Sequence, residues 1–284
     1  MFLTVFTPVY NRADTLGRLY DSLLKQSCLD FEWLIVDDGS TDETGEVVKG
    51  FTGEGKFPVR YIYKENGGKH TAHNLALEEA RGTWFWCVDS DDTVTPQAVQ
   101  WLLSAALPNE NGILSYKTDL AGRRLGTEFP AGEDALSLVQ LAQQGCKGEY
   151  AMAFRTAYAR QFPFPVFPGE RFVTENVVYD RMETPFVLLR QVTNPCEYQP
   201  EGYSAGTDRL MRNNPNGFCL YFMQRVDLAQ GLKNRLVTAG KYWCFRLISG
   251  NKTLRYRGKH PACTALALPL GLVFRGYYKL FREI

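Results

Sequence analysis

Four strand-like runs, each followed by a helix-like run, fill residues 1–107 of this 284-residue chain. β-Branched and aromatic residues predict the strands, at residues 2–6, 33–36, 59–63 and 84–88. Apolar residues at helical spacing mark the helices between them, as in Leu16, Leu19 and Leu23. Regular alternation of this kind is typical of an α/β fold, in which a mostly parallel central sheet is flanked by helices and binds ligands at the carboxyl ends of its strands.

Acidic residues follow two of these strands, at the edge where ligands are expected. Asp37 and Asp38 come after the second strand, and Asp89-Ser90-Asp91-Asp92 comes after the fourth. Three carboxylates within four residues repel one another unless a cation joins them, and Mg²⁺ or Mn²⁺ is a natural partner for oxygen ligands. A metal site and a solvated acidic turn are the two interpretations of this tetrapeptide taken alone.

Motifs that the sequence lacks disfavour several classes of site. The loop after the first strand, Thr7-Pro8-Val9-Tyr10-Asn11-Arg12, is not the glycine loop of NAD or FAD sites, and the phosphate loop of nucleotide triphosphatases does not occur. The seven cysteines include no Cys-x-x-Cys pair, which argues against a zinc or dithiol site. Their odd number and the lack of a signal-peptide pattern predict a cytoplasmic protein. We expect no nucleic-acid partner.

The C-terminal part of the sequence differs in charge from the rest. Residues 228–282 hold eleven of the 32 Lys and Arg residues and no Asp or Glu, so residues 1–227 carry 21 basic and 30 acidic side chains. The apolar run 262–274 is interrupted by Pro269 and is shorter than the roughly 20 residues of a membrane-spanning helix. We interpret it either as a segment lying on the anionic inner face of the cell membrane, or as a terminal helix packed on the acidic body of the protein.

Four stretches, taken in order, resemble the motifs of family 2 glycosyltransferases. They are Thr7–Arg12, Asp37–Asp42, Asn66–Lys69 with Ala72-His73-Asn74, and Asp89–Asp92. The resemblance is strong over about the first 110 residues and weaker to about residue 205. It implies an inverting enzyme with the GT-A fold, a Rossmann-like, mixed, mostly parallel central sheet flanked by helices, followed here by a helical or irregular C-terminal extension.

The expected domain organisation follows from this resemblance. A glycosyltransferase domain would span residues 1–225, with a nucleotide-sugar-binding half over 1–118 and an acceptor-binding half over 119–225. Residues 226–284 would form the basic, apolar extension, in which 228–282 is the candidate contact with an anionic membrane surface.

The resemblance also implies which residues hold the nucleotide. The base and ribose would be bound by the first loop and by the second Asp of the Asp-Asp-Gly-Ser motif, with further donor contacts beside them: Thr7, Pro8, Tyr10, Arg12, Asp38 and Ser90. A carboxylate can accept hydrogen bonds from a uracil N–H or from ribose hydroxyls. The alternative for Asp38 is capping of the next helix, although Ser40 already has capping-box spacing to Glu43.

The remaining donor contacts would surround the diphosphate. By the resemblance, Asp91 ligates a divalent metal, and Asp89 contacts the ribose or the metal shell, with Asp92 as a neighbour. Many family members have an Arg for the diphosphate where this chain has His73, and Lys69, after Gly68 in a loop that opens a helix, would supply the permanent charge instead. The alternative interpretation of His73 is that it and His70 are exposed helix residues one turn apart.

An inverting transfer needs a base that takes the proton of the attacking hydroxyl. The family usually places it in a Glu-Asp pair, and the matching region here reads Thr174-Glu175-Asn176, in a helix predicted over 173–182. An amide cannot serve as the base, so Glu175 is the candidate, with Tyr179 and Arg181 to orient it or the acceptor. The alternative for Glu175 is an interaction with the helix dipole.

The sequence therefore predicts a metal-dependent inverting glycosyltransferase that moves a sugar from a nucleotide diphosphate, with UDP expected, to a hydroxyl group of a glycan or lipid-linked glycan. One alternative is a sugar-1-phosphate nucleotidyltransferase, which would usually show a glycine-rich basic loop after the first strand. The other is a non-catalytic nucleotide- or glycan-binding module, which the departures at His73 and Asn176 favour.

Overall fold

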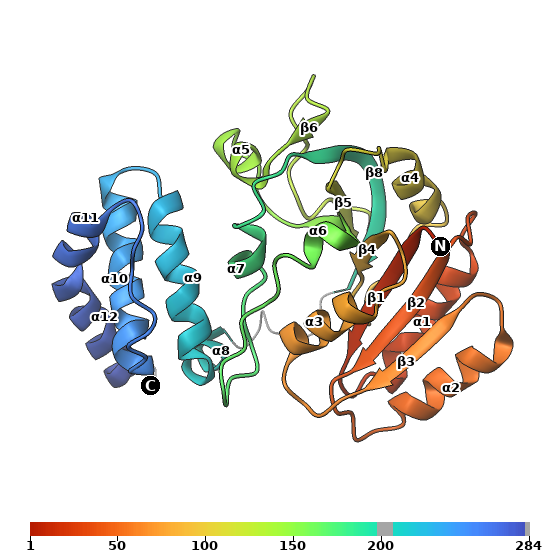
Figure 1. Cartoon of the computed structure of the whole chain (residues 1–284), viewed down its shortest axis with the longest axis horizontal. Helices are drawn as coiled ribbons and strands as arrows, with labels where there is room; N and C mark the ends of the chain where they lie inside the picture. Colours follow the sequence, from red (N-terminus) through yellow and green to blue (C-terminus); the bar gives the residue numbers. More distant parts are fainter. Residues whose placement is uncertain (198–206, 282–284) are drawn as a thin grey trace. The chain divides into compact units, whose positions relative to one another are not determined.

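The computed structural model describes residues 1–197 and 207–281 (Figure 1). Its strands are β1 (Leu3–Val9), β2 (Phe31–Asp37), β3 (Val59–Tyr63), β4 (Trp84–Cys87), β5 (Gly112–Asp119), β6 (Ala135–Leu136), β7 (Tyr150–Arg155) and β8 (Phe186–Cys196). They form one sheet in the order β3-β2-β1-β4-β7-β5-β8-β6. The four strands expected from the sequence are therefore all present and adjacent, apart from shifts of their ends.

The helices before residue 198 lie between these strands along the chain. They are α1 (Ala13–Leu24), α2 (Thr44–Glu54), α3 (Lys69–Glu79), α4 (Ala98–Ala105), α5 (Leu138–Gln143), α6 (Thr156–Ala159) and α7 (Asn176–Tyr179). The remaining helices follow residue 206: α8 (Thr207–Asn213), α9 (Pro215–Leu228), α10 (Leu232–Ser249), α11 (Pro261–Leu266) and α12 (Leu268–Phe281).

Strand direction confirms the mixed, mostly parallel sheet. The first four strands pair in parallel, β1 with both β2 and β4, and β2 with β3. β7 is antiparallel to β4 and to β5, and β5 pairs in parallel with β8. Because β7 reverses direction between β4 and β5, the carboxyl ends of β5 and β8 lie at the same edge of the sheet as those of β1, β2 and β4.

Helices cover both faces of the sheet, because successive strand residues point to opposite sides. Apolar side chains of α1, α2 and α4 form one core with β1 and β2, including Leu16, Val48, Val99, Val5 and Trp33. On the other face, α3 packs against the sheet, and Phe6 and Phe85 contact the ring of His73 edge-on. The sheet therefore has a hydrophobic layer on each side.

The described chain divides into two compact units, one of residues 1–163 and 181–197 and one of 164–180 and 207–281. Side-chain contacts explain why 164–180 joins the C-terminal helices. Glu170 accepts hydrogen bonds from the backbone N–H groups of Asn216 and Gly217 at the start of α9, at 2.7 and 2.9 Å. Asp180 forms an ion pair with Arg225 of the same helix, at 2.9 Å.

This division differs from the boundary expected at residue 225. That position lies inside α9, and Val226, one residue further on, is fully buried against Ala239. The core of the second unit is aromatic, with Phe218, Phe222 and Phe245 in mutual ring contact. Among residues 1–197 and 207–281, no helix combines the length and apolar character needed to cross a membrane.

Candidate functional site at the carboxyl edge of the sheet

The loops after β1 and β2 are tied to each other at the carboxyl edge. The backbone N–H of Asn11 donates to Ser40 Oγ at 2.8 Å, and Asn11 Oδ1 accepts from the backbone N–H of Thr41 at 2.8 Å. The backbone N–H of Arg12 donates to Thr44 Oγ1 at 3.0 Å. Asn11 adopts φ 53°, a left-handed conformation that Asn tolerates better than most residues. These contacts fix the backbone that carries Tyr10 and Arg12.

Asp38 is buried and orders the glycine loop that precedes α3. One carboxylate oxygen accepts from Lys64 Nζ at 2.5 Å and from the backbone N–H of Gly67 at 2.9 Å, and the other accepts from Gly68 at 2.7 Å. The neighbouring Gly39 has φ 87°, and a Cβ there would lie 2.8 Å from the backbone nitrogen of Asn66. The two loops therefore approach more closely than any residue with a side chain at position 39 allows.

Lys69, the first residue of α3, reaches the first acidic residue after β4. Its Nζ lies 2.8 Å from Asp89 Oδ1. Desolvation raises the pKa of Asp89, but the charges of Lys69 and Lys117 outweigh it, so the net shift is downward. Asp89 is therefore an anion that faces fixed positive charge at the amino end of a helix.

Asp91 lies in a different electrostatic environment two residues further on. Desolvation and the charge of Asp89 raise the pKa of Asp91, against the opposing charges of Arg12 and Lys69. Its backbone carbonyl accepts from Arg18 Nη2 at 3.0 Å, and Arg18 also pairs with Glu197 at 2.5 Å. A cation bound at Asp91 would relieve both causes of its raised pKa.

Asp92 points away into the sheet and is only 4% exposed. Its Oδ2 lies 3.4 Å from Lys117 Nζ and 3.2 Å from the thiol of Cys196, and Asn194 Nδ2 lies 3.4 Å away. Desolvation raises the pKa of Asp92 to about 6, although Lys117 lowers it. Asp92 thus connects the acidic turn to β5 and β8.

Lys117, Cys196 and Arg18 were not among the residues predicted from the sequence. Burial lowers the pKa of Lys117, but the charge of Asp92 outweighs it and the net shift is upward, so this lysine is charged. The sequence carries one signal for Lys117. This lysine directly follows the largely apolar run Ile113–Tyr116, and a lysine in a buried strand needs an acidic partner. The partner itself depends on pairing between distant strands.

The predicted nucleotide-binding residues differ in how exposed they are. Thr7 is fully buried within β1, and its hydroxyl accepts from Trp33 Nε1 at 2.9 Å. Pro8 is partly buried, and Tyr10 is exposed at the loop tip. Ser90 is buried within the acidic turn, beside Asp89 and Asp91.

The alternative in which His70 and His73 are exposed helix residues is wrong. Their exposed fractions are 2% and 6%, because the side of α3 that carries them packs on the sheet. Burial lowers the pKa of His70; the charge of Asp38 opposes this shift, and the charge of Lys64 adds to it. His73 lies against Phe6 and Phe85, so its role at the diphosphate remains a prediction.

Glu175 belongs to the second compact unit. Its role as the catalytic base stays a prediction. It occupies the N-cap position of α7, which has four residues instead of the predicted ten, and it is exposed. Tyr179 is buried on the same helix. Arg181 lies in the first unit, with its guanidinium 5.5 Å from the ring centre of Phe162.

The acidic turn fits a metal ion that is bound partly by carboxylates and partly by phosphate oxygens. In the described part of the chain, no group of three or more His, Cys, Asp or Glu side chains could enclose a metal ion. Mg²⁺ at phosphate sites commonly takes only one or two carboxylates, with the other ligands from the phosphates and water. Asp91 with Asp89 can supply that number.

The family model of Glycosyl transferase family 2 matches residues 4–167, more than half of the chain. The chain is 37% identical over 117 residues to chondroitin synthase of Pasteurella multocida (strain Pm70), covering 41% of this chain and 12% of that protein. It is 35% identical over 119 residues to glycosyltransferase GlyA of Streptococcus pneumoniae serotype 4, covering 42% and 16%. The chain thus spans less than a fifth of the length of these two relatives.

Solved structures share the fold at low sequence identity. S. aureus TarS in complex with UDP-GlcNAc superposes with a TM-score of 0.61 at 18% identity, covering 94% of this chain and 80% of that one. The mannosyltransferase PcManGT from Pyrobaculum calidifontis, in complex with GDP-Man and Mn²⁺, has a TM-score of 0.51 at 18% identity, covering 98% and 81%.

Proposed function

The chain belongs to glycosyl transferase family 2, and on that premise we propose that it transfers a sugar from a UDP-linked donor to a hydroxyl group of a glycan or lipid-linked glycan, with inversion at the anomeric carbon. The observation that carries this proposal is the carboxyl edge, where Asp89 and Asp91 are surrounded by Arg12, Lys69 and Lys117. Acidic ligands among fixed cations suit a diphosphate that binds together with a metal ion. TarS, with the same fold, was solved with UDP and with UDP-GlcNAc, which further supports a UDP donor.

The donor diphosphate would bind where the amino end of α3 meets the acidic turn. Lys69 supplies a permanent positive charge there, and the backbone around Gly68 contributes the positive end of the helix dipole. Asp38 and Tyr10, with the loop that begins at Thr7 and Pro8, would hold the nucleoside. Asp38 retains one acceptor position after its three hydrogen bonds, since a carboxylate offers about four.

Asp91, with Asp89 beside it, would hold Mn²⁺ or Mg²⁺. When bound, such an ion neutralises charge that develops on the departing nucleotide diphosphate. PcManGT was solved with Mn²⁺ and GDP-Man, which supports a metal in this family fold. Arg12 and Lys69 lower the cost of bringing the negative diphosphate next to two carboxylates.

Glu175 is the proposed base. Its carboxylate would take the proton of the acceptor hydroxyl while that oxygen forms a bond to the anomeric carbon, and the bond from this carbon to the diphosphate breaks on the opposite side. The nucleotide diphosphate leaves with the bonding electron pair, so the configuration is inverted. The exposure of Glu175 suits a group that must meet a second substrate.

A cytoplasmic location, with peripheral contact at the inner face of the cell membrane, would bring the enzyme to lipid-linked acceptors. The charge asymmetry between residues 1–227 and 228–282 supports this assignment.

Thermal unfolding with a panel of nucleotide diphosphates tests the donor site. We would measure the full chain with UDP, GDP, CDP, dTDP and ADP, each with and without Mn²⁺. UDP with Mn²⁺ at 100 times its Kd should add about 2.7 kcal/mol of stability. The shift should disappear in Asp91→Ala and persist in Asp21→Ala, which removes an exposed carboxylate from α1. No shift with any of the five would reject the donor site.

Glu175→Gln separates catalysis from binding. This variant should keep the shift with UDP and Mn²⁺ but release UDP from its sugar donor, with water as acceptor, about 10²- to 10⁴-fold more slowly. Unchanged release would remove Glu175 from the mechanism. Equal loss of binding and release would mean that Glu175 acts in donor binding and not as the base, and no release by the native chain would point to a non-catalytic module.

A further inference from the structure

The outermost C-terminal helix, α12, is apolar on two opposite sides. Its inner side packs on α10, where Leu270 and Phe274 approach Gly240 so closely that a Cβ at Gly240 would lie within 3.0 Å of both side chains. A Cβ at Gly271 would lie 2.4 Å from the Cβ of Trp243, whose Nε1 donates to the carbonyl oxygen of Thr264 in α11 at 2.6 Å. The inner side of α12 is therefore fully occupied by packing.

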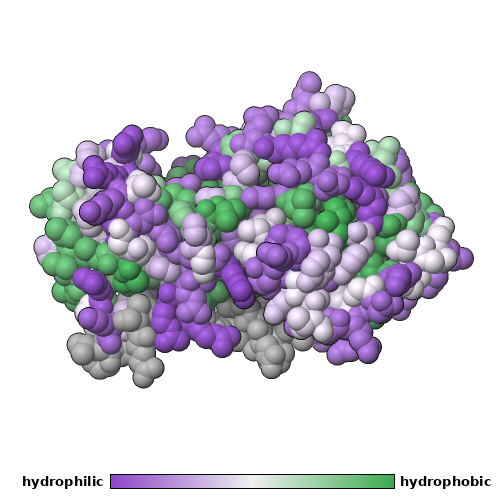
Figure 2. Space-filling model, turned by 60° about the horizontal axis from the view of Figure 1, so that its bottom comes forward, coloured by the Kyte–Doolittle hydropathy of each residue, from purple (hydrophilic) through white to green (hydrophobic). Residues whose placement is uncertain are grey.

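The outer side of α12 carries large apolar residues that are exposed to solvent. Leu268, Pro269, Leu272, Val273 and Tyr277 are all exposed. At about 100° per residue, these positions form one continuous half of the helix surface. Leu266 of α11 extends it and is 75% exposed. We call these six residues the outer apolar face; Figure 2 shows an apolar surface over the C-terminal helices, at the left.

This pattern is the reverse of that of an ordinary surface helix, which turns charged residues to water. In α12 the exposed charges are Arg275 and Lys279, and both lie at one margin of the outer apolar face. A helix that is apolar on both sides is covered on both sides in its working state. The outer apolar face therefore indicates a binding surface.

The surrounding charge identifies the occupant. From residue 228 to 281 there are ten Lys and Arg residues and no Asp or Glu, and Lys252, Arg255, Arg257 and Lys259 are exposed just before α11. A second copy of the chain on the same face would bring like charges together, because a two-fold contact repeats Arg275 and Lys279 on each side. Anionic lipid headgroups are complementary to this charge, and acyl chains to the apolar residues.

The length of α12 determines how it can meet a bilayer. Fourteen residues make a helix of about 21 Å, shorter than the roughly 30 Å hydrocarbon core. We infer that α11 and α12 lie flat in the headgroup region of an anionic bilayer, with the outer apolar face toward the acyl chains. The biological role of this membrane contact rests on the proposed function: it would place the enzyme at the surface that carries lipid-linked acceptors.

Vesicle co-sedimentation of the full chain tests the inference. The vesicles contain phosphatidylcholine alone or with phosphatidylglycerol. The double variant Leu272→Ser, Val273→Ser removes residues that are 52% and 65% exposed, and the control Leu120→Ser, Val166→Ser removes two that are each 58% exposed elsewhere. We expect binding only to the anionic vesicles, weakened about tenfold or more in the first variant and unchanged in the control.

Charge and self-association are measured alongside. Arg275→Gln with Lys279→Gln should weaken binding to anionic vesicles and reduce its dependence on salt. The UDP and Mn²⁺ thermal shift should be the same in every variant, which distinguishes a failure at the membrane surface from a failure at the donor site. Lack of binding to anionic vesicles, or equal binding by the Leu272 and Val273 double variant, would overturn the inference. So would a dimer in sedimentation that this double variant dissociates.

Discussion

Three carboxylates at the carboxyl edge are each paired with a cation from a different element. Asp38 pairs with Lys64 before α3, Asp89 with Lys69 at the start of α3, and Asp92 with Lys117 in β5. Because every pair crosses between elements, the same contacts that neutralise the acids also hold the loops in place. Burial and the charge of Asp89 raise the pKa of Asp91.

Replacing Lys117 with Met should destabilise the protein by about 3 kcal/mol at pH 7.5, because it leaves the buried Asp92 without its charge partner. The loss should shrink as the pH falls toward about 6, because Asp92 binds a proton more readily without Lys117 and is then neutral in the variant. Lys117→Arg should recover part of the stability, and Lys147→Met, at an exposed lysine, should change little. Chemical denaturation at pH 7.5 and 5.5 measures both effects, and a loss independent of pH would contradict the pairing.

His70 provides a second pH-dependent prediction. Its pKa is lowered by burial, so the unfolded chain binds a proton more readily than the folded one between the lowered pKa and about 6.5. This contribution to stability is present above pH 6.5 and is lost as the pH falls. His70→Gln should therefore lose less stability than the native chain between pH 7.5 and 5.5. The carboxyls of Asp92 and Asp180, with pKa about 6, change stability in the opposite sense in both proteins, so the difference isolates His70.

Sequence reasoning found the acidic residues and Lys69 because they directly follow strands or open a helix. It missed the burial of the two histidines, because polar residues in a helix are usually exposed. His70, His73 and Leu77 stand at i, i+3 and i+7, which is the spacing of one buried side of a helix. It missed Lys117 and Arg18 because their partners lie far away in the sequence, at Asp92 and Asp91.

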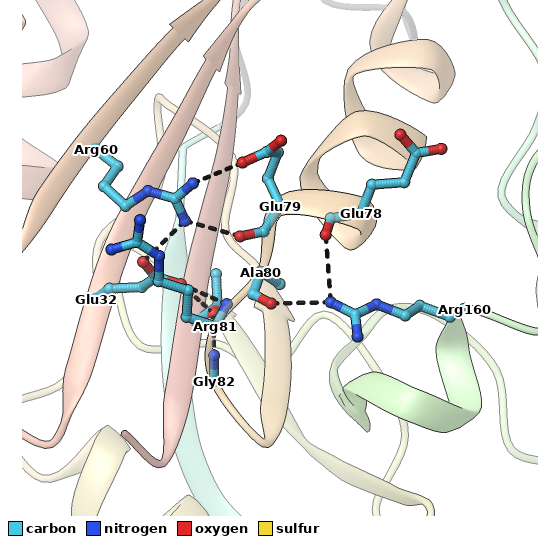
Figure 3. A network of polar contacts seen from close by, with 9 residues as sticks. Glu32, Arg60, Glu78, Glu79, Ala80, Arg81, Gly82 and Arg160 are labelled. Atoms are coloured by element: carbon cyan, nitrogen blue, oxygen red, sulfur yellow. Dashed lines mark hydrogen bonds and ion pairs between the residues drawn. The ribbon is translucent and has the colours of Figure 1, made fainter.

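At the scale of elements, α3 is held at both of its ends. Asp38 orders the loop at its amino end, and the guanidinium of Arg160 donates to the carbonyl oxygens of Leu77 and Ala80 at its carboxyl end. Figure 3 shows the second set of contacts there, in which Arg60 bridges Glu79 and the fully buried Glu32. Lys69 is therefore presented by a helix that is fixed in position.

Glu32→Gln tests how much this attachment contributes. Glu32 also accepts from Thr4 Oγ1 at 2.7 Å and from the backbone N–H of Arg81 at 2.8 Å, so removing its charge weakens several buried bonds at once. We expect a loss of about 2–4 kcal/mol in unfolding free energy. Glu79→Gln, which removes the exposed partner of the same Arg60, should cost about 1 kcal/mol or less. Equal losses would show that Glu32 does not anchor the helix.

Helix starts were predicted less well than helices themselves. The Ser40 and Glu43 spacing predicts a capping box, yet α2 begins at Thr44 without a side-chain cap. Ser40 Oγ instead accepts from Asn11, and Asp42 accepts from the backbone N–H groups of Ala13 and Thr44. Capping residues here serve the contact between two loops, and a local pattern does not reveal a partner thirty residues away.

At the scale of the whole molecule, the four β-α repeats of the first half were predictable because each depends on local periodicity. The second half was not, since β5 and β8 pair in parallel across about seventy residues and β7 inserts between β4 and β5 in the opposite direction. The grouping of 164–180 with the C-terminal helices rests on Glu170 and Asp180, two contacts without a sequence signature.

The most direct test of the proposed donor site is hydrogen exchange of the full chain with and without UDP and Mn²⁺. We predict slower exchange in the loops 7–12, 37–41, 66–70 and 89–92, which come together at the carboxyl edge, and no such change in Asp91→Ala. Bound UDP that leaves these four loops unchanged, or that protects residues elsewhere in the chain, would contradict the assignment of this edge as the donor site.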